Sequence, residues 1–262
     1  MFVLAVVAGA VLSRENAPAA ATPLRVCADP NDMPFSNRAG EGFENKIAAI
    51  VGRDLNRPVQ YTWWLQRRNY IRNTLDAGRC DAIIGFPAAA HDALTTASYY
   101  TSTYVFAYRS DRNLKIHSFD DPALRRLRIG VQMTDNDYTP PGAALGRRGL
   151  GSNIAGFRLY GDESGSWKIM DAVAIGTIDV AAVWGPMAGY YAKRSRVPLI
   201  IAPVSPPRDG IVPFTFSIAA AVRKGNRALQ QKIDEALRRN RAEVNAVLAA
   251  YGVPVVRQGG DR

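Results

Sequence analysis

Aromatic, carboxyl and guanidinium side chains follow the ends of several predicted strands, where they could bind a ligand or a protein surface. A short apolar strand at 24–28 leads into a polar break, and a helix begins near residue 43. In α/β proteins, loops at the carboxyl ends of strands meet in the crevice that binds ligands. We therefore predict a binding cleft lined from the first half of the chain by Asp29, Asn31, Phe35, Trp63, Trp64, Arg67, Arg68, Phe86, Thr101 and Tyr104, and from the second half by Gln132, Asp135, Asp162 and Trp184.

The Trp and Arg side chains of this set have more than one possible use. Both residue types are favoured at protein–protein contacts, and both stack on planar aromatic ligands such as a quinone cofactor. Strand alternation would also bury one of Trp63 and Trp64 inside the fold, and Arg67 and Arg68 also fit a solvated helix start. The sequence leaves these alternatives open.

Catalytic and metal-binding patterns are missing from the sequence. The two histidines, His91 and His117, lie in polar segments without a Ser or Cys in a nucleophile setting. The acidic pairs at 120–121 and 162–163 are typical of helix starts, where carboxylates suit the helix dipole. Because no metal-ligand spacing is present either, we predict a protein that is not an enzyme and holds no metal or cofactor.

The two cysteines, Cys27 and Cys80, fall in the first half of the chain. In an oxidising compartment we expect a disulfide between them. Two buried thiols are the alternative if the strands hold them too far apart. Their separation is not the C-x-x-C spacing of redox catalysts.

The first residues predict export. The apolar run at 2–12 is too short to span a membrane, and small residues at 19–21 offer a cleavage position, so we interpret 1–21 as a signal peptide and expect a periplasmic protein. No later segment is apolar for long enough to span a bilayer. The mature chain should therefore carry no membrane span.

The chain is strongly basic, with a net charge of +10 and 33 Lys and Arg residues, of which 27 are Arg. Such a balance fits a solvated basic surface or attraction to an acidic partner. Nucleic acid is not expected as a partner, because export and the absence of a recognition motif argue against it.

Strands and helices alternate along the chain in two similar units. The order in the first unit is strand 24–28, helix 43–55, strand 58–63, helix 70–77 and strand 81–85, which predicts a parallel sheet with right-handed crossovers. Extended segments at 99–109 and 214–222 lead to the second unit and back. We predict an α/β protein whose lobe 1 comprises 22–102 and 216–256, whose lobe 2 comprises 103–215, and which ends in a loose tail at 257–262. Two hinge crossings of this kind permit closure around a guest.

This order, with the segments GTIDV (176–180) and AVRKGN (221–226), resembles the type II periplasmic solute-binding proteins of ABC importers over about 24–256. Three longer blocks, LRVCADPNDMPFSNRAGEGFENKIA, YTWWLQRRNYIRNTLDAGRCD and YYTSTYVFAYR, are similar to the MoxJ/XoxJ group. That resemblance implies a periplasmic accessory protein that assists maturation or activation of a PQQ-dependent methanol dehydrogenase. It implies the dehydrogenase and possibly its c-type cytochrome as partners, with PQQ and a calcium or lanthanide ion in the dehydrogenase.

The ionic anchors of amino-acid-binding members are missing here. Those members hold the ligand carboxylate with an Arg shortly after the third strand, but 86–108 contains no Arg or Lys. They hold the ligand ammonium with an Asp after the last cleft strand of lobe 2, where this chain has Trp184-Gly185-Pro186. A buried zwitterion without charged partners costs several kcal/mol. The alternative function is therefore the substrate-binding component of an ABC importer for a small solute that is not an amino acid.

Overall fold

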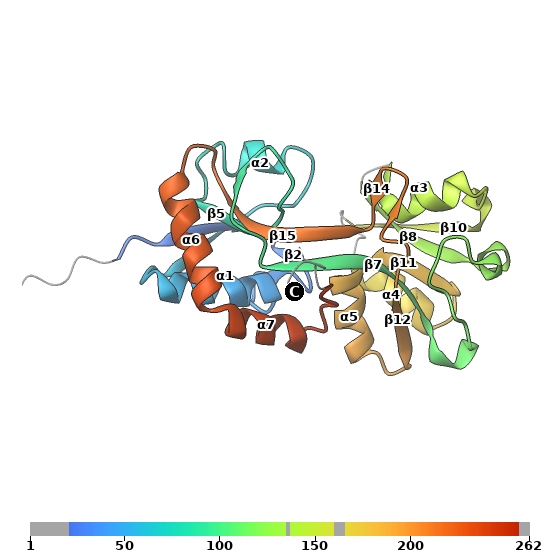
Figure 1. Ribbon diagram of the computed structural model, residues 1–262. Helices are drawn as coiled ribbons and strands as arrows, with labels where there is room; N and C mark the ends of the chain where they lie inside the picture. Colours follow the sequence, from blue (N-terminus) through green and yellow to red (C-terminus); the bar gives the residue numbers. More distant parts are fainter. Residues whose placement is uncertain (1–20, 135–136, 160–165, 257–262) are drawn as a thin grey trace, which may run out of the picture.

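The computed structural model describes residues 21–134, 137–159 and 166–256, and shows an elongated molecule of two α/β lobes (Figure 1). The predicted class, two α/β lobes joined by two crossing strands, is confirmed. Nearly all of the predicted signal peptide and the predicted tail lie outside the described residues. Within the described ranges, no helix combines the length and the apolar character needed to cross a bilayer.

The sheet of the first lobe has a parallel centre. β1 (Leu24–Ala28) pairs in parallel with β4 (Val59–Trp63) on one side and with β5 (Ala82–Pro87) on the other. The parallel arrangement predicted from the alternation of elements is thereby confirmed. β4 lies at the edge of the sheet, because no further strand follows it in the strand order.

Three helices cover one face of this sheet (Figure 1): α1 (Phe43–Asp54), α6 (Arg227–Arg239) and α7 (Arg241–Ala250). Each turns an apolar stripe inward, so that Ile47 of α1 and Ile233 of α6 are fully buried in one core with the strands. The two C-terminal helices therefore belong to the first lobe although they follow the second lobe in sequence.

The second lobe repeats this plan. β8 (Ile129–Thr134) pairs in parallel with β10 (Ile154–Arg158) and β11 (Val180–Trp184), and β12 (Leu199–Pro203) pairs antiparallel with the crossing strand β7 (Tyr100–Arg109). The helices are α3 (Pro140–Arg147) on one face and α4 (Ser166–Ala174) and α5 (Gly185–Arg194) on the other (Figure 1). Short pieces complete the fold: β2 (Asn31–Asp32), β3 (Ser36–Asn37), α2 (Tyr70–Asn73), β6 (Leu94–Thr95), β9 (Asp137–Tyr138), β13 (Arg208–Asp209), β14 (Val212–Pro213) and 3-10 turns at Ser110–Arg112, Pro122–Arg126 and Gly151–Asn153.

The crossing strands β7 and β15 (Thr215–Val222) run side by side between the lobes as an antiparallel pair (Figure 1). Thr103 lies opposite Thr215, and Tyr100 opposite Ile218. The C-terminal segment after α7 joins them, because Val256 N–H donates to the Thr101 carbonyl oxygen (2.8 Å). The hinge thus consists of two paired strands with a third segment bonded along one edge.

Some predicted helices differ from those observed. The helix predicted at 70–77 ends at Asn73, because Thr74 leaves helical geometry and its hydroxyl donates to the Tyr70 carbonyl oxygen (2.6 Å). Residues 123–127, whose sequence predicts a short helix at the start of the second unit, belong to a 3-10 turn at Pro122–Arg126. The sequence predicts that Gly185 and Pro186 end a strand at 180–184 and that a helix follows at 187–193. The strand does end at Trp184, but α5 already begins at Gly185, since proline fits the first turn of a helix.

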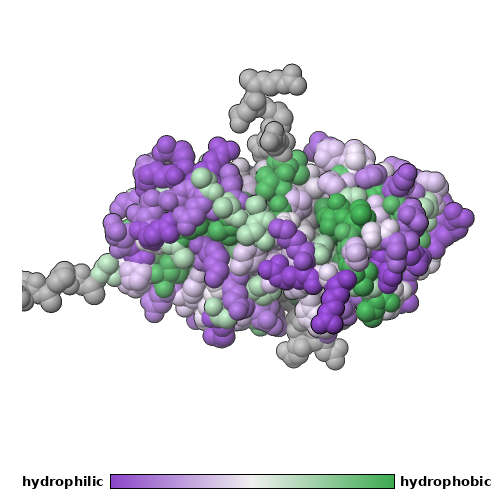
Figure 2. Space-filling model, turned by 90° about the horizontal axis from the view of Figure 1, so that it is seen from below, coloured by the Kyte–Doolittle hydropathy of each residue, from purple (hydrophilic) through white to green (hydrophobic). Residues whose placement is uncertain are grey.

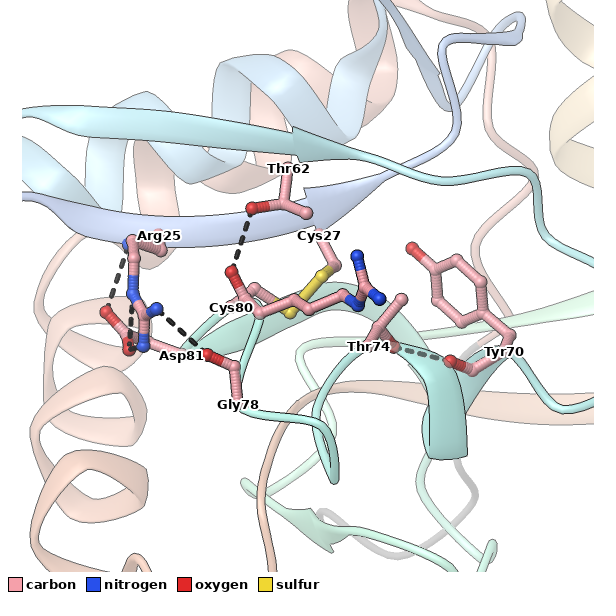
Figure 3. Close-up of a disulfide and its surroundings, with 9 residues drawn as sticks. Arg25, Cys27, Thr62, Tyr70, Thr74, Gly78, Cys80 and Asp81 are labelled. Atoms are coloured by element: carbon pink, nitrogen blue, oxygen red, sulfur yellow. Dashed lines mark hydrogen bonds and ion pairs between the residues drawn. A yellow bond between two sulfur atoms is a disulfide. The ribbon is translucent and has the colours of Figure 1, made fainter.

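The predicted disulfide between Cys27 and Cys80 is confirmed, with the two Cα atoms 5.5 Å apart (Figure 3). It links β1 to the turn before β5. Beside it, the Arg25 guanidinium donates to the Asp81 carboxylate (2.7 Å) and to the Gly78 carbonyl oxygen (2.9 Å). Closing a loop with a sequence separation of 53 stabilises the folded state by about 4 kcal/mol on the chain-entropy account.

Candidate functional site

A cavity of about 330 Å³ lies where the two lobes and the two crossing strands meet. The first lobe contributes side chains from β2, α1 and β5, the second from β8, β11 and α5, and the crossing strands contribute aromatic residues. Its lining consists of Asp32, Phe35, Glu44, Gln66, Gly85, Pro87, Tyr100, Tyr104, Gln132, Thr134, Thr139, Leu159, Trp184, Met187, Phe216 and Ile218.

Three aromatic rings from three strands form one wall of the cavity. The ring centroid of Tyr104 lies 5.4 Å from that of Trp184 and 6.3 Å from that of Phe216, and Trp184 and Phe216 are 5.8 Å apart. All three pairs meet edge to face, the arrangement that ring quadrupoles favour. A rigid aromatic wall therefore stands at the junction of the lobes.

Gln132 and Thr139 form the polar part of the cavity lining that the second lobe contributes. The backbone N–H of Trp184 donates to Oε1 of Gln132 (3.2 Å), and the Thr139 hydroxyl donates to the Gln132 carbonyl oxygen (3.0 Å). The buried Gln132 amide is thus held by the strand beside it. These groups offer hydrogen bonds to a guest but no charge.

Glu44 brings a carboxyl group to the first lobe's side, on the same stripe of α1 as Ile47 and Val51. Gly85 lies directly against it, since a Cβ atom at position 85 would stand 1.8 Å from Glu44 Oε1. Burial, and secondarily the neighbouring Asp32, raise the pKa of Glu44 to about 8. Glu44 is therefore mostly neutral at pH 7.

The two cavity tyrosines also stay neutral. Burial raises the pKa of Tyr100 and of Tyr104 well above the ordinary tyrosine value, and the Glu44 carboxyl group adds to the effect at Tyr100. The lining includes no Lys, Arg or His among the described residues. Asp32 and Glu44 supply the carboxyl groups of the described lining.

Four residues of the predicted cleft line this cavity: Phe35, Tyr104, Gln132 and Trp184. Asp29 is buried under the first loop, where its carboxylate accepts from the Asn31 backbone N–H (2.9 Å) and the Gln66 backbone N–H (2.7 Å). Its position gives it a structural task, since it joins the loops after β1 and β4. Asn31 is exposed, and Thr101 bonds to Ser217 (2.9 Å) between the crossing strands.

The remaining predicted residues lie away from the lining. Trp63 stacks on Tyr61 with ring centroids 4.7 Å apart, and Trp64 packs against the core around the disulfide with the Arg79 guanidinium 4.8 Å from its ring. Phe86 is buried in that same core, while Arg67 and Arg68 are exposed. Asp135 and Asp162 lie outside the described residues.

Sequence reasoning missed Glu44, Tyr100 and Phe216. Glu44 carried a detectable signal, because it is a carboxyl residue on the apolar stripe of an amphipathic helix. Phe216 and Ile218 alternate with polar residues along β15, which indicated that they share a face but not which face meets the cavity. Their meeting with Trp184 depends on the pairing of β15 with β7.

Metal binding finds no support in the described ranges, where no three His, Cys, Asp or Glu side chains are grouped as ligands would be. Charged groups gather outside the cavity instead. Seen from below, the surface is largely hydrophilic, with hydrophobic patches near the middle and on the second lobe (Figure 2). Eight arginines form ion pairs with Asp or Glu side chains, and these arginines lie outside the cavity lining.

Comparison with known proteins places the chain among binding proteins. The family model for bacterial extracellular solute-binding proteins, family 3, matches residues 24–251. Protein MoxJ of Methylorubrum extorquens is 32% identical over 250 residues, covering 89% of this chain and 81% of the relative. Protein MoxJ of Paracoccus denitrificans is 30% identical over 271 residues, covering 95% of each.

Solved structures agree with the sequence relatives. The periplasmic binding protein XoxJ of Methylobacterium extorquens has a TM-score of 0.75 and 34% identity, covering 90% of this chain and all of that one. MxaJ of Methylophaga aminisulfidivorans has a TM-score of 0.78 and 28% identity, covering 89% of this chain and all of that one. An ancestral cationic amino acid solute-binding protein shares the fold, with a TM-score of 0.68 at 18% identity.

Proposed function

The chain belongs to the bacterial extracellular solute-binding proteins of family 3, and within them to the MoxJ/XoxJ group; on that premise we propose that it is a non-catalytic periplasmic accessory protein of a PQQ-dependent methanol dehydrogenase. In this role it assists maturation or activation of the enzyme through its cleft or its outer surface. The observation that carries the proposal is the relation to MoxJ over almost the whole chain.

The cavity supports this role over amino-acid capture. An amino-acid ligand would bring a carboxylate into a site whose described lining holds Asp32 and Glu44 but no cation. Since a buried carboxylate without a partner is strongly disfavoured, the site suits another kind of guest. Membership in a binding-protein family supports the absence of catalysis, and the extracellular character of that family supports export by the N-terminal segment to the periplasm.

The test is removal of the protein from a methanol-oxidising host. We expect a deletion strain to secrete the dehydrogenase polypeptide in normal amounts but with most of its activity lost, and activity to return when this chain is supplied on a plasmid. Dehydrogenase abundance is measured by immunoblot and activity by dye reduction in periplasmic extracts. Full activity in the deletion strain would refute the accessory role.

Solute capture for an ABC importer is the competing function, favoured by the presence of a cavity between the lobes. It predicts a small molecule retained by gently extracted native protein, detectable by mass spectrometry. It also predicts loss of uptake in the deletion strain, with dehydrogenase activity intact. The accessory role predicts the opposite pair of results for activity and uptake.

A further inference from the structure

We infer that the interlobe cavity binds an organic cation, an ammonium group carried on an apolar body, in preference to a neutral or anionic guest. This inference deepens the proposed function by naming the class of ligand that the cleft binds. It rests on the proposed function only where it asks whether the cation is a free amine or a side chain of a partner protein. The arguments come from the aromatic wall, from the Glu44 carboxyl group and from the distribution of charge around them.

The aromatic wall suits both parts of such a ligand. Phe35, Tyr104, Trp184 and Phe216 supply apolar surface, and the negative ring faces of Trp and Tyr attract a nearby cation. The volume of about 330 Å³ is at the small end for ligand sites, which suits a compact guest. An apolar molecule alone would use the wall but leave the polar side of the cavity unmatched.

Glu44 supplies the matching charge. Neither a hydrogen-bond donor nor a positive group among the described residues acts on its carboxyl group, which burial holds in the neutral form. Gly85 has no side chain, and the Glu44 carboxyl group occupies the space that a side chain on β5 would fill. A cation is the partner that this half-buried acid at the cavity lacks.

The surrounding side chains offer no cationic partner to the opposite ligand class. An anion would meet Glu44 and Asp32 on the first lobe's side, with neutral Gln132 and Thr139 across the cavity. The arginines that carry the chain's positive charge form their ion pairs outside the lining. A free polycarboxylate such as a pyrroloquinoline quinone is therefore a poor guest, although its ring system would suit the aromatic wall.

Binding of a cation is coupled to a proton. Near pH 7 the protonated Glu44 carboxyl group gives its proton to solvent as the ammonium group arrives, which leaves a carboxylate–ammonium pair and one released proton. The affinity for the cation should therefore rise with pH between about 6 and 8, whereas a neutral guest should bind independently of pH.

The experiment is calorimetric titration of the purified protein with benzylamine, benzyl alcohol and benzoate, three probes of similar size and different charge. We expect benzylamine to bind at least tenfold more tightly than benzyl alcohol at pH 7, and benzoate to bind most weakly. Repeating the titration in two buffers of different ionisation enthalpy should reveal close to one proton released per benzylamine. Quenching of Trp fluorescence provides an independent measure of binding.

The matched variants are Glu44→Gln and, as control, Glu41→Gln, which alters an exposed carboxyl group in the loop before α1. Glu44→Gln should bind benzyl alcohol as the parent does, lose the tenfold preference for the amine and release no proton. Glu41→Gln should keep both properties. Unchanged preference and proton release in Glu44→Gln would overturn the inference, as would a parent protein that binds benzoate as well as benzylamine or binds none of the probes.

Two further probes separate a free amine from a lysine side chain of a partner protein. The peptide acetyl-Gly-Lys-Gly-amide is compared with its norleucine counterpart. Selective binding of benzylamine without the lysine peptide would identify the ligand as a free amine. Selective binding of the lysine peptide, with or without benzylamine, would identify it as a protein side chain. Either result supports the cation site. Since purified protein is used, these results do not depend on whether the deletion strain loses dehydrogenase activity.

Discussion

The carboxyl group of Glu44 lies in the first turn of α1, where helix N–H groups ordinarily favour a negative charge. Burial outweighs that preference and keeps the group protonated near neutrality, because no donor among the described residues compensates the lost hydration. A half-buried acid of this kind stabilises the fold less than an apolar residue would. We interpret it as a group kept for binding.

Replacing Glu44 with Gln should alter the pH dependence of stability. The pKa of Glu44 is raised to about 8 from an ordinary 4.5. Between these pH values the folded protein therefore binds more protons than the unfolded chain, and the free energy of unfolding of the parent falls as the pH rises. Glu44→Gln should equal the parent at pH 4.5 and exceed it by a few kcal/mol at pH 8.5. Urea unfolding at both pH values measures this.

Glu41→Gln is again the control, and it should follow the parent at both pH values because its carboxyl group is exposed. A Glu44→Gln protein with the same pH profile as the parent would show that Glu44 is ionised in the folded state.

Among the elements, α5 of the second lobe rests against the end of α7 of the first. Lys193 Nζ donates to the Ala249 carbonyl oxygen (2.7 Å), and the rings of Tyr190 and Tyr251 stack with centroids 5.6 Å apart. A Cβ atom on Gly189 would stand 1.9 Å from the Gly252 carbonyl oxygen. Glycine at 189 is therefore required for the helices to meet, and this joint sets how the lobes are angled.

Gly189→Ala should push the two helices apart. The added methyl group has no space against the backbone of Gly252, so we expect a loss of about 1–3 kcal/mol in the free energy of unfolding. A changed radius of gyration in solution scattering should accompany it. Gly146→Ala is the matched control in another helix: nothing lies within 4 Å of the new methyl group, and stability should rise by up to about 1 kcal/mol. Equal stability of Gly189→Ala and the parent would argue against the contact.

At the scale of the whole molecule, two lobes surround a cavity with carboxyl groups and carry a basic exterior. The net charge of +10 comes from 33 Lys and Arg residues, of which 27 are Arg. Carboxyl groups in the cavity and an exterior rich in Arg let the two surfaces select different partners, a small cation within the cleft and an acidic protein outside it. The accessory role uses both surfaces without conflict.

Association with the dehydrogenase should weaken as salt is added. At 0.1 M salt, charges more than about 10 Å apart are largely screened, so a complex steered by the Arg-rich surface should lose much of its association rate between about 20 and 500 mM NaCl. Surface plasmon resonance with immobilised dehydrogenase measures this. A rate unaffected by salt would indicate that apolar contacts, such as the exposed Trp167 and Ile175 side chains of the second lobe, bring the partners together.

The sequence by itself determined the order of strands and helices, the parallel sheets, the crossing strands and the family, and it predicted the Cys27–Cys80 disulfide that the structure confirmed. These depend on local periodicity, on contiguous motifs and on the compartment. It could also place Phe35, Tyr104, Gln132 and Trp184 at the cleft, because each lies at or near a strand end or a crossing. The boundaries proposed for the lobes rest on the same reasoning.

Only the tertiary structure decided which side chains face the cavity. Trp63 and Trp64 lie away from it because the Trp63 ring stacks on Tyr61 and the Trp64 ring packs into the core around the disulfide, although Gln66 of the same segment lines the cavity. Glu44 and Gly85 meet because α1 packs across β5, and Phe216 reaches Trp184 because β15 pairs with β7. Such contacts join residues that are far apart in the sequence. The periodicity of one segment indicates which of its residues share a face, but it cannot specify which other segment packs against that face.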